Sequence, residues 1–373
     1  MRNIIFLTGT RADFGKIKAL IQAIENHSNF EPHIFVTGMH LLHEYGYTLI
    51  EVERCGFKNI ATFNNYTDEA TMDLTLAKTI NGFSEYIKIT EPDLIVVHGD
   101  RVEALAGAIV GSLNNILVAH IEGGELSGTI DELIRHSVTK LSHVHFTSND
   151  NAKKRLLQMG ELETSIFTIG SPDVDIMFSN NLPKLDVVKG YYQIDFTSYA
   201  LAMYHPVTTE LDAIEENANN FVDALIESGK NYVVIYPNND LGSKHILDAY
   251  KRLVNNNRFK VFPSIRFEYF LTLLKNANFI IGNSSVGIRE APYYGIPTVN
   301  IGNRQLKRAT SSEIINTSSE KSKILEALKG LSNKVEVSNE IFGKGNSAEL
   351  FLNSLESQNL WDINHQKQFY DAY

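Results

Sequence analysis

The chain of 373 residues has a single cysteine, Cys55, so no disulfide framework can form within it. One cysteine fits a reducing cytoplasm, and the expected role of Cys55 is that of a buried structural thiol. Apolar runs are short. None approaches the ~20 residues needed to span a bilayer, and Ile4–Leu7 is too short for the core of a signal peptide. We therefore expect a cytoplasmic protein that does not enter a membrane.

Positive charge is also scarce, with 34 basic against 44 acidic residues and a net charge of −10. This balance argues against a protein that binds nucleic acid or an anionic membrane surface. An anionic small ligand would need a local cluster of basic side chains. The apolar content of 43% and the charged content of 21% are typical of a globular protein, and no repeat or low-complexity tract is present.

The order of elements predicts an α/β fold made of two doubly wound domains. Short apolar runs without polar alternation indicate buried parallel strands, and helical periodicity fills the intervals between them. The expected strands are Asn3–Thr8, His33–Thr37, Leu94–Val97, Ile116–Ala119, Val144–Thr147, Ile166–Ile169, Tyr199–Tyr204, Tyr232–Tyr236, Lys260–Phe262, Phe279–Ile281 and Thr298–Ile301.

The stretch Ser179–Thr197 lacks a long apolar run and is the expected linker between the domains. The chain length suits two domains of ordinary size. We predict a first domain over residues 1–178, a second over 179–347, and a C-terminal segment over 348–373 with a helix at Ala348–Leu360.

Acidic side chains follow two neighbouring apolar strands. His98 and Asp100 close the first of these strands, and His120 and Glu122 close the second, with Asp131 soon after. Side chains two apart on a strand share a face, so each histidine and its acid would point the same way. Ligands bind at the carboxyl edge of such sheets, and clustered carboxylates raise one another's pKa toward the range of acid–base catalysis. The pattern predicts an active site.

Other interpretations of these residues are open. Imidazole with carboxylate is a common metal-ligand set, but histidines at the ends of buried strands are more often hydrogen-bonded core residues. Asp131 with Arg135 is also compatible with an ordinary helix pair at i, i+4 spacing. Asp100 and Glu122 together favour a functional role more strongly than Asp131 alone.

The segment Gly9–Lys16 follows the first strand and predicts an anion site, because free N–H groups and a helix dipole would face the ligand. Arg11 and Lys16 would add positive charge, and Asp13 is a plausible N-cap. The alternative is a routine turn between strand and helix with two solvated cations.

A second candidate anion site is Gly282–Ser285, between an apolar strand and an expected helix at Val286–Tyr294. Ser284 and Ser285 could hold phosphate oxygens without a metal, although such a pair is more often an N-cap. Matching sites in both halves favour a diphosphate ligand. His205 ends the first strand of the second half and is the best-placed histidine for catalysis or phosphate contact.

Several long motifs in order resemble the hydrolysing UDP-N-acetylglucosamine 2-epimerases, in the branch that supplies N-acetylmannosamine for sialic acid synthesis. The resemblance runs from Arg11 to about Arg304. The motifs are GTRADFGK, VHGDRVEAL, HIEGGELSGTIDELIRH, YHPVTTE and GNSSVGIREAPYYGIPTVNIG.

The resemblance implies a GT-B fold, with two Rossmann-like domains facing across a cleft, UDP bound in the second and the C-terminal helix returning onto the first. It also implies a homo-oligomer, either a homodimer or a dimer of dimers, and no nicotinamide cofactor or obligatory metal. The reaction of the family eliminates UDP to give 2-acetamidoglucal, and water addition then releases N-acetylmannosamine.

The resemblance also assigns roles to residues of this sequence. Its three carboxylates match Asp100, Glu122 and Asp131, with the abstracting and returning acids unassigned, and His205 joins them as a catalytic candidate. The positions that match phosphate contacts are Arg11, His205, Ser284 and Ser285, the ribose contact matches Glu290, and Lys16, Arg101 and Arg304 are further candidates for binding substrate or nucleotide.

Three alternatives remain at this stage. Some relatives act on UDP- or GDP-linked 2,4-diacetamido-6-deoxy sugars for legionaminic-type acids, and the motifs say little about C4 and C6. Relatives that keep UDP attached carry two consecutive acids before their helix, whereas Asp131 here sits in GTIDELIRH, which resembles the hydrolysing, sialic-acid-type branch. A GT-B glycosyltransferase would need an acceptor, and a UDP-sugar sensor would have no use for three acids.

Overall fold

The computed structural model describes residues 1–67, 71–305, 314–331 and 342–371. Two compact units form. The first unit comprises Met1–Glu125, Asp131–Asn180 and Ile341–Tyr373, and the second comprises Leu126–Ile130 and Asn181–Glu340. Among the described residues, no helix is long and apolar enough to cross a membrane.

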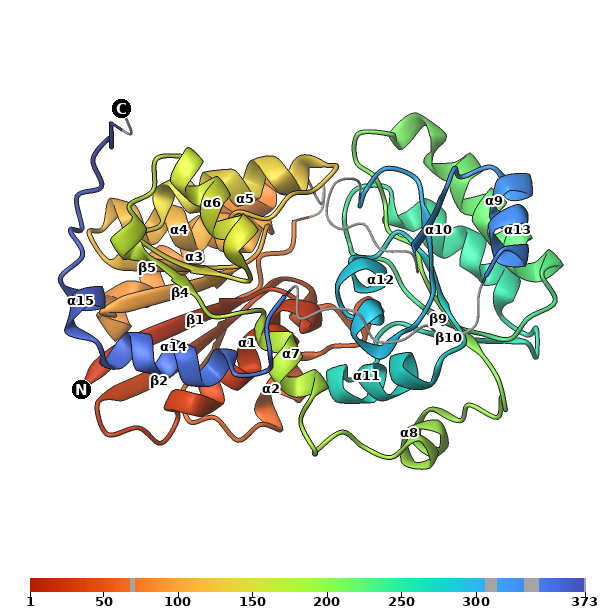
Figure 1. Ribbon diagram of the computed structural model, residues 1–373, viewed down its shortest axis with the longest axis horizontal. Helices are drawn as coiled ribbons and strands as arrows, with labels where there is room; N and C mark the ends of the chain where they lie inside the picture. Colours follow the sequence, from red (N-terminus) through yellow and green to blue (C-terminus); the bar gives the residue numbers. More distant parts are fainter. Residues whose placement is uncertain (68–70, 306–313, 332–341, 372–373) are drawn as a thin grey trace. The chain divides into compact units, whose positions relative to one another are not determined.

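Within the described residues, the first unit contains a parallel seven-stranded sheet in the order β3-β2-β1-β4-β5-β6-β7. Figure 1 labels its strands β1, β2, β4 and β5. Its strands are β1 Arg2–Thr8, β2 Phe30–Val36, β3 Ile60–Thr62, β4 Leu94–His98, β5 Leu117–Ile121, β6 Val144–Thr147 and β7 Ile166–Thr168. Its helices are α1 Arg11–Ile24, α2 Leu49–Glu53, α3 Met72–Thr90, α4 Val102–Leu113, α5 Ile130–Leu141, α6 Asp150–Gln158, α7 Pro172–Met177, α14 Ser347–Glu356 and α15 Gln358–Trp361.

The second unit contains, in its described part, a parallel six-stranded sheet in the order β10-β9-β8-β11-β12-β13. Its strands are β8 Ala200–Met203, β9 Tyr232–Ile235, β10 Phe259–Phe262, β11 Ile280–Gly282, β12 Thr298–Ile301 and β13 Ile314–Thr317. Its helices are α8 Leu185–Tyr192, α9 Ile214–Glu227, α10 Ser243–Tyr250, α11 Phe267–Asn276, α12 Val286–Arg289 and α13 Lys321–Lys329.

The predicted doubly wound α/β class is confirmed, and each expected strand is present with its ends shifted by no more than a few residues. Sequence analysis missed β3 and β13, which lie at sheet edges. Both are short and only partly buried, so they lack the continuous apolar run that marks a central strand. The predicted linker Ser179–Thr197 contains the helix α8, which packs on α11.

Each sheet has one topological switch point, where the chain connections leave in opposite directions. In the first unit it lies between β1 and β4, and in the second between β8 and β11. Ligands of open α/β sheets bind outside the carboxyl ends of the strands at such points. The two positions favoured for ligand binding are therefore occupied by the segments that follow these strands. In the first unit the segments begin at Gly9 and Gly99, and in the second at Tyr204 and Asn283.

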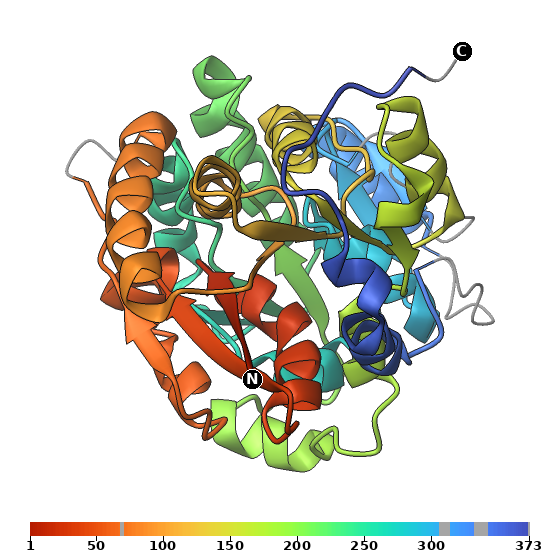
Figure 2. The same cartoon turned by 90° about the vertical axis from the view of Figure 1, so that its left-hand side faces the viewer.

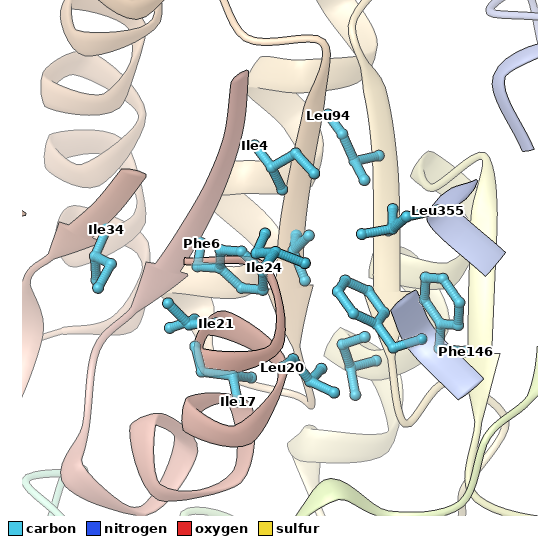
Figure 3. Close-up of a cluster of buried hydrophobic side chains, with 14 of the residues drawn as sticks. Ile4, Phe6, Ile17, Leu20, Ile21, Ile24, Ile34, Leu94, Phe146 and Leu355 are labelled. Carbon is cyan, nitrogen blue, oxygen red and sulfur yellow. The ribbon is translucent and has the colours of Figure 1, made fainter. Parts of the chain in front are cut away.

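The core of the first unit includes a helix from the far end of the chain. Phe351 and Leu355 of α14 are buried with Phe6 of β1 and Phe146 of β6, and the ring centres of Phe146 and Phe351 lie 5.0 Å apart (Figure 3). Burial of each side chain stabilises the unit by roughly 1.5–3 kcal/mol. The single C-terminal helix expected at Ala348–Leu360 is instead two helices, with a break at the extended residue Ser357.

Beyond α15 the chain, dark blue in Figure 2, reaches the C-terminal end of α5. The ammonium of Lys367 donates to the carbonyls of Thr139 at 3.0 Å and Ser142 at 2.7 Å, and contacts Glu161 at 2.5 Å. Cations stabilise helix C-termini. Because α5 carries Asp131 in its first turn and Arg135 near its middle, the tail supports a helix of the candidate site.

The pH dependence of stability should reveal the contacts of Glu161 with His145 and Lys367. Burial would raise the pKa of Glu161, but the hydrogen bond from His145 and the charge of Lys367 outweigh burial and lower that pKa to about 2. A depressed folded pKa stabilises the protein above pH ~4.5, and the contribution, about 3 kcal/mol, disappears as the pH falls through about 2.

We expect Glu161→Gln to be less stable than the wild type at pH 7, with a difference that shrinks between pH 5 and 2. Urea unfolding at several pH values measures this difference. Glu163→Gln is the control, because Glu163 is exposed and pairs only at the surface with Lys153. A difference that does not change with pH would contradict the assigned cause.

Candidate active site

The turn after β1 is closed by its own side chains. Thr10, and not the predicted Asp13, is the N-cap of α1, since its hydroxyl accepts the Asp13 N–H at 3.2 Å. The Asp13 carboxylate in turn accepts the N–H groups of Gly9 and Thr10, both at 3.0 Å. The amides of Gly9 and Thr10 are therefore used within the turn. An anion site at the start of α1, with Arg11 and Lys16, stays a prediction.

A shared face for each histidine and its acid was expected only if strand geometry continued past the histidine, and it does not continue. Gly99 has a φ of +74° and Glu122 a φ of +64°, so both strand ends turn. His98 instead faces the acid of the neighbouring strand, with Nε2 at 3.2 Å from Oε2 of Glu122. His120 is fully buried and its Nε2 donates to the Gly99 carbonyl at 2.8 Å. Burial lowers the pKa of His120 well below its usual value.

Glu122 lies in a buried cluster of charges. The hydroxyl of Ser171 donates to its Oε1, and the Lys16 ammonium is 3.6 Å from the same oxygen. Lys16 is also 3.3 Å from Oδ2 of Asp173, which is 1% exposed. Buried charges are tolerated when they are paired in this way. Sequence analysis selected Lys16 and Glu122 but neither Ser171 nor Asp173, whose only signal was the segment Gly170–Asp173 after β7.

Asp100 and Glu122 are joined through one guanidinium. Arg135, 3% exposed, donates from Nη2 to the carboxylate of Asp100 and from Nη1 to the Glu122 carbonyl at 2.6 Å. Two of the three predicted acids thus lie close together at the carboxyl ends of the neighbouring strands β4 and β5. Asp131 is half-buried in the first turn of α5. Arg101 lies beside Asp100, with Nε 3.3 Å from Glu103.

In the second unit, His205 is held by an asparagine that sequence analysis did not select. Asn283 accepts the backbone N–H of His205 at 2.6 Å and donates to its carbonyl at 2.8 Å. The ring Nδ1 accepts the N–H of Asn238 at 3.0 Å. In the neutral ring the proton is therefore on Nε2, which makes that atom a hydrogen-bond donor.

The other predicted residues of the second unit surround the segment after β11. Arg304 donates to the Asn283 carbonyl at 3.2 Å, and Ser284 Oγ accepts the Val286 N–H at 3.4 Å. Ser285 precedes α12, and Glu290 is buried directly after it. The helix expected at Val286–Tyr294 is shorter than predicted: α12 ends at Arg289 and a 3-10 helix follows at Ala291–Tyr294. Pro292 has no N–H with which to continue an α-helix.

The strand-end histidines do not gather with their acids into a set of metal ligands in the described part of the chain. Among the residues that the structure describes, no group of three or more histidine, cysteine or acidic side chains is placed to hold a metal ion. His98 contacts a carboxylate and His120 bonds to the backbone, so the two strand-end histidines serve different partners.

Two doubly wound parallel sheets, each with polar side chains at its switch point, define an α/β protein with a GT-B fold. The family profile described as UDP-N-acetylglucosamine 2-epimerase matches residues 22–356. The chain belongs to the UDP-N-acetylglucosamine 2-epimerase family of enzymes.

Individual relatives agree with this assignment. A UDP-N-acetylglucosamine 2-epimerase of Neisseria meningitidis serogroup B is 46% identical, over 100% of this chain and 99% of the relative. The UDP-N,N'-diacetylbacillosamine 2-epimerase (hydrolyzing) of Legionella pneumophila is 32% identical, over 94% of both chains. The crystal structure of Methanocaldococcus jannaschii UDP-GlcNAc 2-epimerase in complex with UDP-GlcNAc and UDP has a TM-score of 0.82 and 26% identity, covering 95% of this chain and 99% of that one.

Proposed function

We propose that this chain is a hydrolysing 2-epimerase that converts UDP-N-acetylglucosamine to N-acetylmannosamine and UDP, in support of sialic acid synthesis. The observation that carries the proposal is that Arg135 binds both the carboxylate of Asp100 and the backbone carbonyl of Glu122, which brings these two acids together at the carboxyl ends of β4 and β5. The name of the Neisseria meningitidis relative, at 46% identity, supports the substrate.

The proposed reaction has two steps, and each needs an acid or a base. In the first, a base removes the proton at C2 while the C1–O bond to the diphosphate breaks, leaving 2-acetamidoglucal and UDP. In the second, water adds its hydroxyl to C1, and a proton returns to the opposite face of C2. Asp100, Glu122 and Asp131 are the groups we assign to these proton transfers, with their order left open.

Departure of UDP places new charge on the diphosphate, and donors aimed at that charge lower the barrier. In the second unit we assign this task to His205, Ser284 and Ser285, supported by the Nε2 proton of His205. Glu290 would bind the ribose hydroxyls and Arg304 would lie near the nucleotide. In the first unit, Arg11, Lys16 and Arg101 would supply positive charge for the nucleotide-sugar.

We further propose that the enzyme acts in the cytoplasm as a homodimer or dimer of dimers and needs no nicotinamide or metal cofactor. The second candidate substrate is a UDP- or GDP-linked 2,4-diacetamido-6-deoxy sugar. It is favoured by the Legionella pneumophila relative, whose name specifies hydrolysis of such a sugar nucleotide. The residues assigned above act on the nucleotide and on C1 and C2, so they suit either sugar.

A proton NMR time course in deuterated water tests the proposal directly. With UDP-N-acetylglucosamine we expect UDP release and N-acetylmannosamine that carries deuterium at C2. Accumulation of UDP-N-acetylmannosamine would contradict hydrolysis, and sugar transfer that requires an added acceptor would indicate a glycosyltransferase. Turnover only of the 2,4-diacetamido sugars would move the substrate to the second candidate.

A further inference from the structure

We propose that Ser171 and Asp173 are positioning residues that set the ionisation of Glu122 from opposite directions, Ser171 favouring the carboxylate and Asp173 opposing it. The inference rests on the proposed function for its catalytic consequence. The inference concerns the segment Gly170–Asp173. None of its residues is among the acids and phosphate contacts assigned above.

Ser171 has the position of a helix N-cap but uses its hydroxyl elsewhere. It precedes α7, and its side chain makes no capping hydrogen bond, although serine is a preferred N-cap. The hydroxyl donates to Oε1 of Glu122 instead. A hydrogen bond to the charged form of a carboxyl group favours that form. Ser171 therefore favours ionised Glu122.

The backbone around Ser171 is held in place, which keeps the hydroxyl directed at Glu122. Its N–H donates to the carbonyl of Phe342 at 2.6 Å. Gly170 has a φ of +86° and lies close to the C-terminal segment. A Cβ added to Gly170 would be 3.0 Å from the Cα of Gly343. The C-terminal segment thus packs directly over the turn that aims the hydroxyl, and a rigid turn is what a positioning residue requires.

Asp173 acts on Glu122 through Lys16. The Lys16 ammonium lies within 3.6 Å of both carboxylates, with Asp173 at the shorter distance of 3.3 Å. The positive charge is therefore shared, and the negative charge of Asp173 opposes ionisation of Glu122. Further groups of the described chain that contact Glu122 include His98, at its Oε2, and Arg135, which binds its backbone carbonyl and links it to Asp100.

The two positioning residues predict opposite shifts. Ser171→Ala should raise the midpoint of the Glu122 carboxyl titration by about 1 pH unit, because a hydrogen bond to a charged group is lost. Asp173→Asn should lower that midpoint, because it removes a negative charge that opposes ionisation of Glu122. In both variants we expect kcat to fall by about 10–100-fold and KM to change by less than about threefold, since neither residue is assigned to the nucleotide.

The measurement is ¹³C NMR of enzyme labelled at the glutamate carboxyl carbons, titrated over pH, with the Glu122 signal identified by its absence from Glu122→Gln. The pH profile of kcat is recorded beside it. Asp93→Asn is the control for Asp173, because Asp93 lies just before β4, at the end of the sheet opposite Glu122, where it accepts the Asn3 N–H. Ser165→Ala is the control for Ser171, because Ser165 is also buried but its hydroxyl donates to the Leu162 carbonyl at 2.8 Å. Neither control should move the Glu122 signal.

Shifts of the same sign in both variants, or no shift in either, would overturn the proposal. If Ser171→Ala does not fold, Asp173→Asn carries the test, and an unchanged or raised midpoint overturns it. The NMR titration needs no substrate. An inactive wild type that still shows opposite shifts would therefore refute the proposed function and uphold the positioning pair.

Discussion

Glu122→Gln and Asp100→Asn should each lower turnover of UDP-N-acetylglucosamine by about 10²–10⁴-fold, the usual contribution of a general acid or base. Each substitution keeps the size of the side chain and removes its ability to exchange a proton. UDP affinity should stay within about threefold of the wild type, because neither carboxylate is assigned to the nucleotide. Single-turnover kinetics and calorimetric titration with UDP measure the two quantities separately.

Two matched substitutions separate catalysis from general damage. The first is Asp93→Asn. Asp93 lies just before β4, at the opposite end of the strand that leads to Asp100, and accepts the Asn3 N–H at 2.8 Å. Glu132→Gln is next to Asp131 on α5 and is only half-buried, 3.6 Å from His136. Both should retain near-normal turnover. Near-normal turnover in the Glu122 and Asp100 variants as well would remove these acids from the mechanism.

Gly282→Ala should unfold the second unit or destabilise it by more than ~4 kcal/mol, which is exceptional for one methyl group. Gly282 ends β11 with a φ of +137°, a conformation that other residues rarely adopt. A Cβ there would lie 1.8 Å from the carbonyl oxygen of Met203, which is backbone of the adjacent central strand. Neither strand can move aside without breaking the sheet at its switch point.

The control for this prediction is Gly56→Ala. Gly56 also has a positive φ, +74°, but a Cβ there meets nothing within 4 Å. Its substitution should cost only about 1–2 kcal/mol, the strain of the left-handed conformation. Urea unfolding followed by circular dichroism compares the two variants. Equal losses of stability would show that strain alone, and not the close approach to Met203, makes Gly282 necessary. Partial unfolding of the second unit should also weaken UDP binding. Asn283 follows Gly282 directly and holds His205, which we assign to the diphosphate.

The strands and the edge on which the site residues gather were predictable, because both follow from local patterns. Buried parallel strands appear as short apolar runs, and Asp100, Glu122, His205 and Ser284 come directly after such runs. Parallel strands bring their carboxyl ends to one edge whatever the details of packing. The edge strands β3 and β13 were missed because they lack that run.

The partner of each side chain could not be read from the sequence. His98 and His120 stand in similar positions after successive strands, yet the first contacts Glu122 and the second bonds to the backbone of the core. The turns at Gly99 and Glu122, both at positive φ, decide this difference. The role of Asn283 could not be predicted either, because its two hydrogen bonds to the backbone of His205 join residues far apart in the chain.

By itself, then, the sequence determined the α/β class, the central strands and the chemical types of residue at the strand ends, because these depend on local hydrophobic pattern and spacing. Only the tertiary structure decided that Lys16 lies between Glu122 and Asp173, that Arg135 joins Asp100 to Glu122, and that α14 completes the core of the first unit. Such contacts join distant segments, and their geometry depends on how whole helices pack against the sheet.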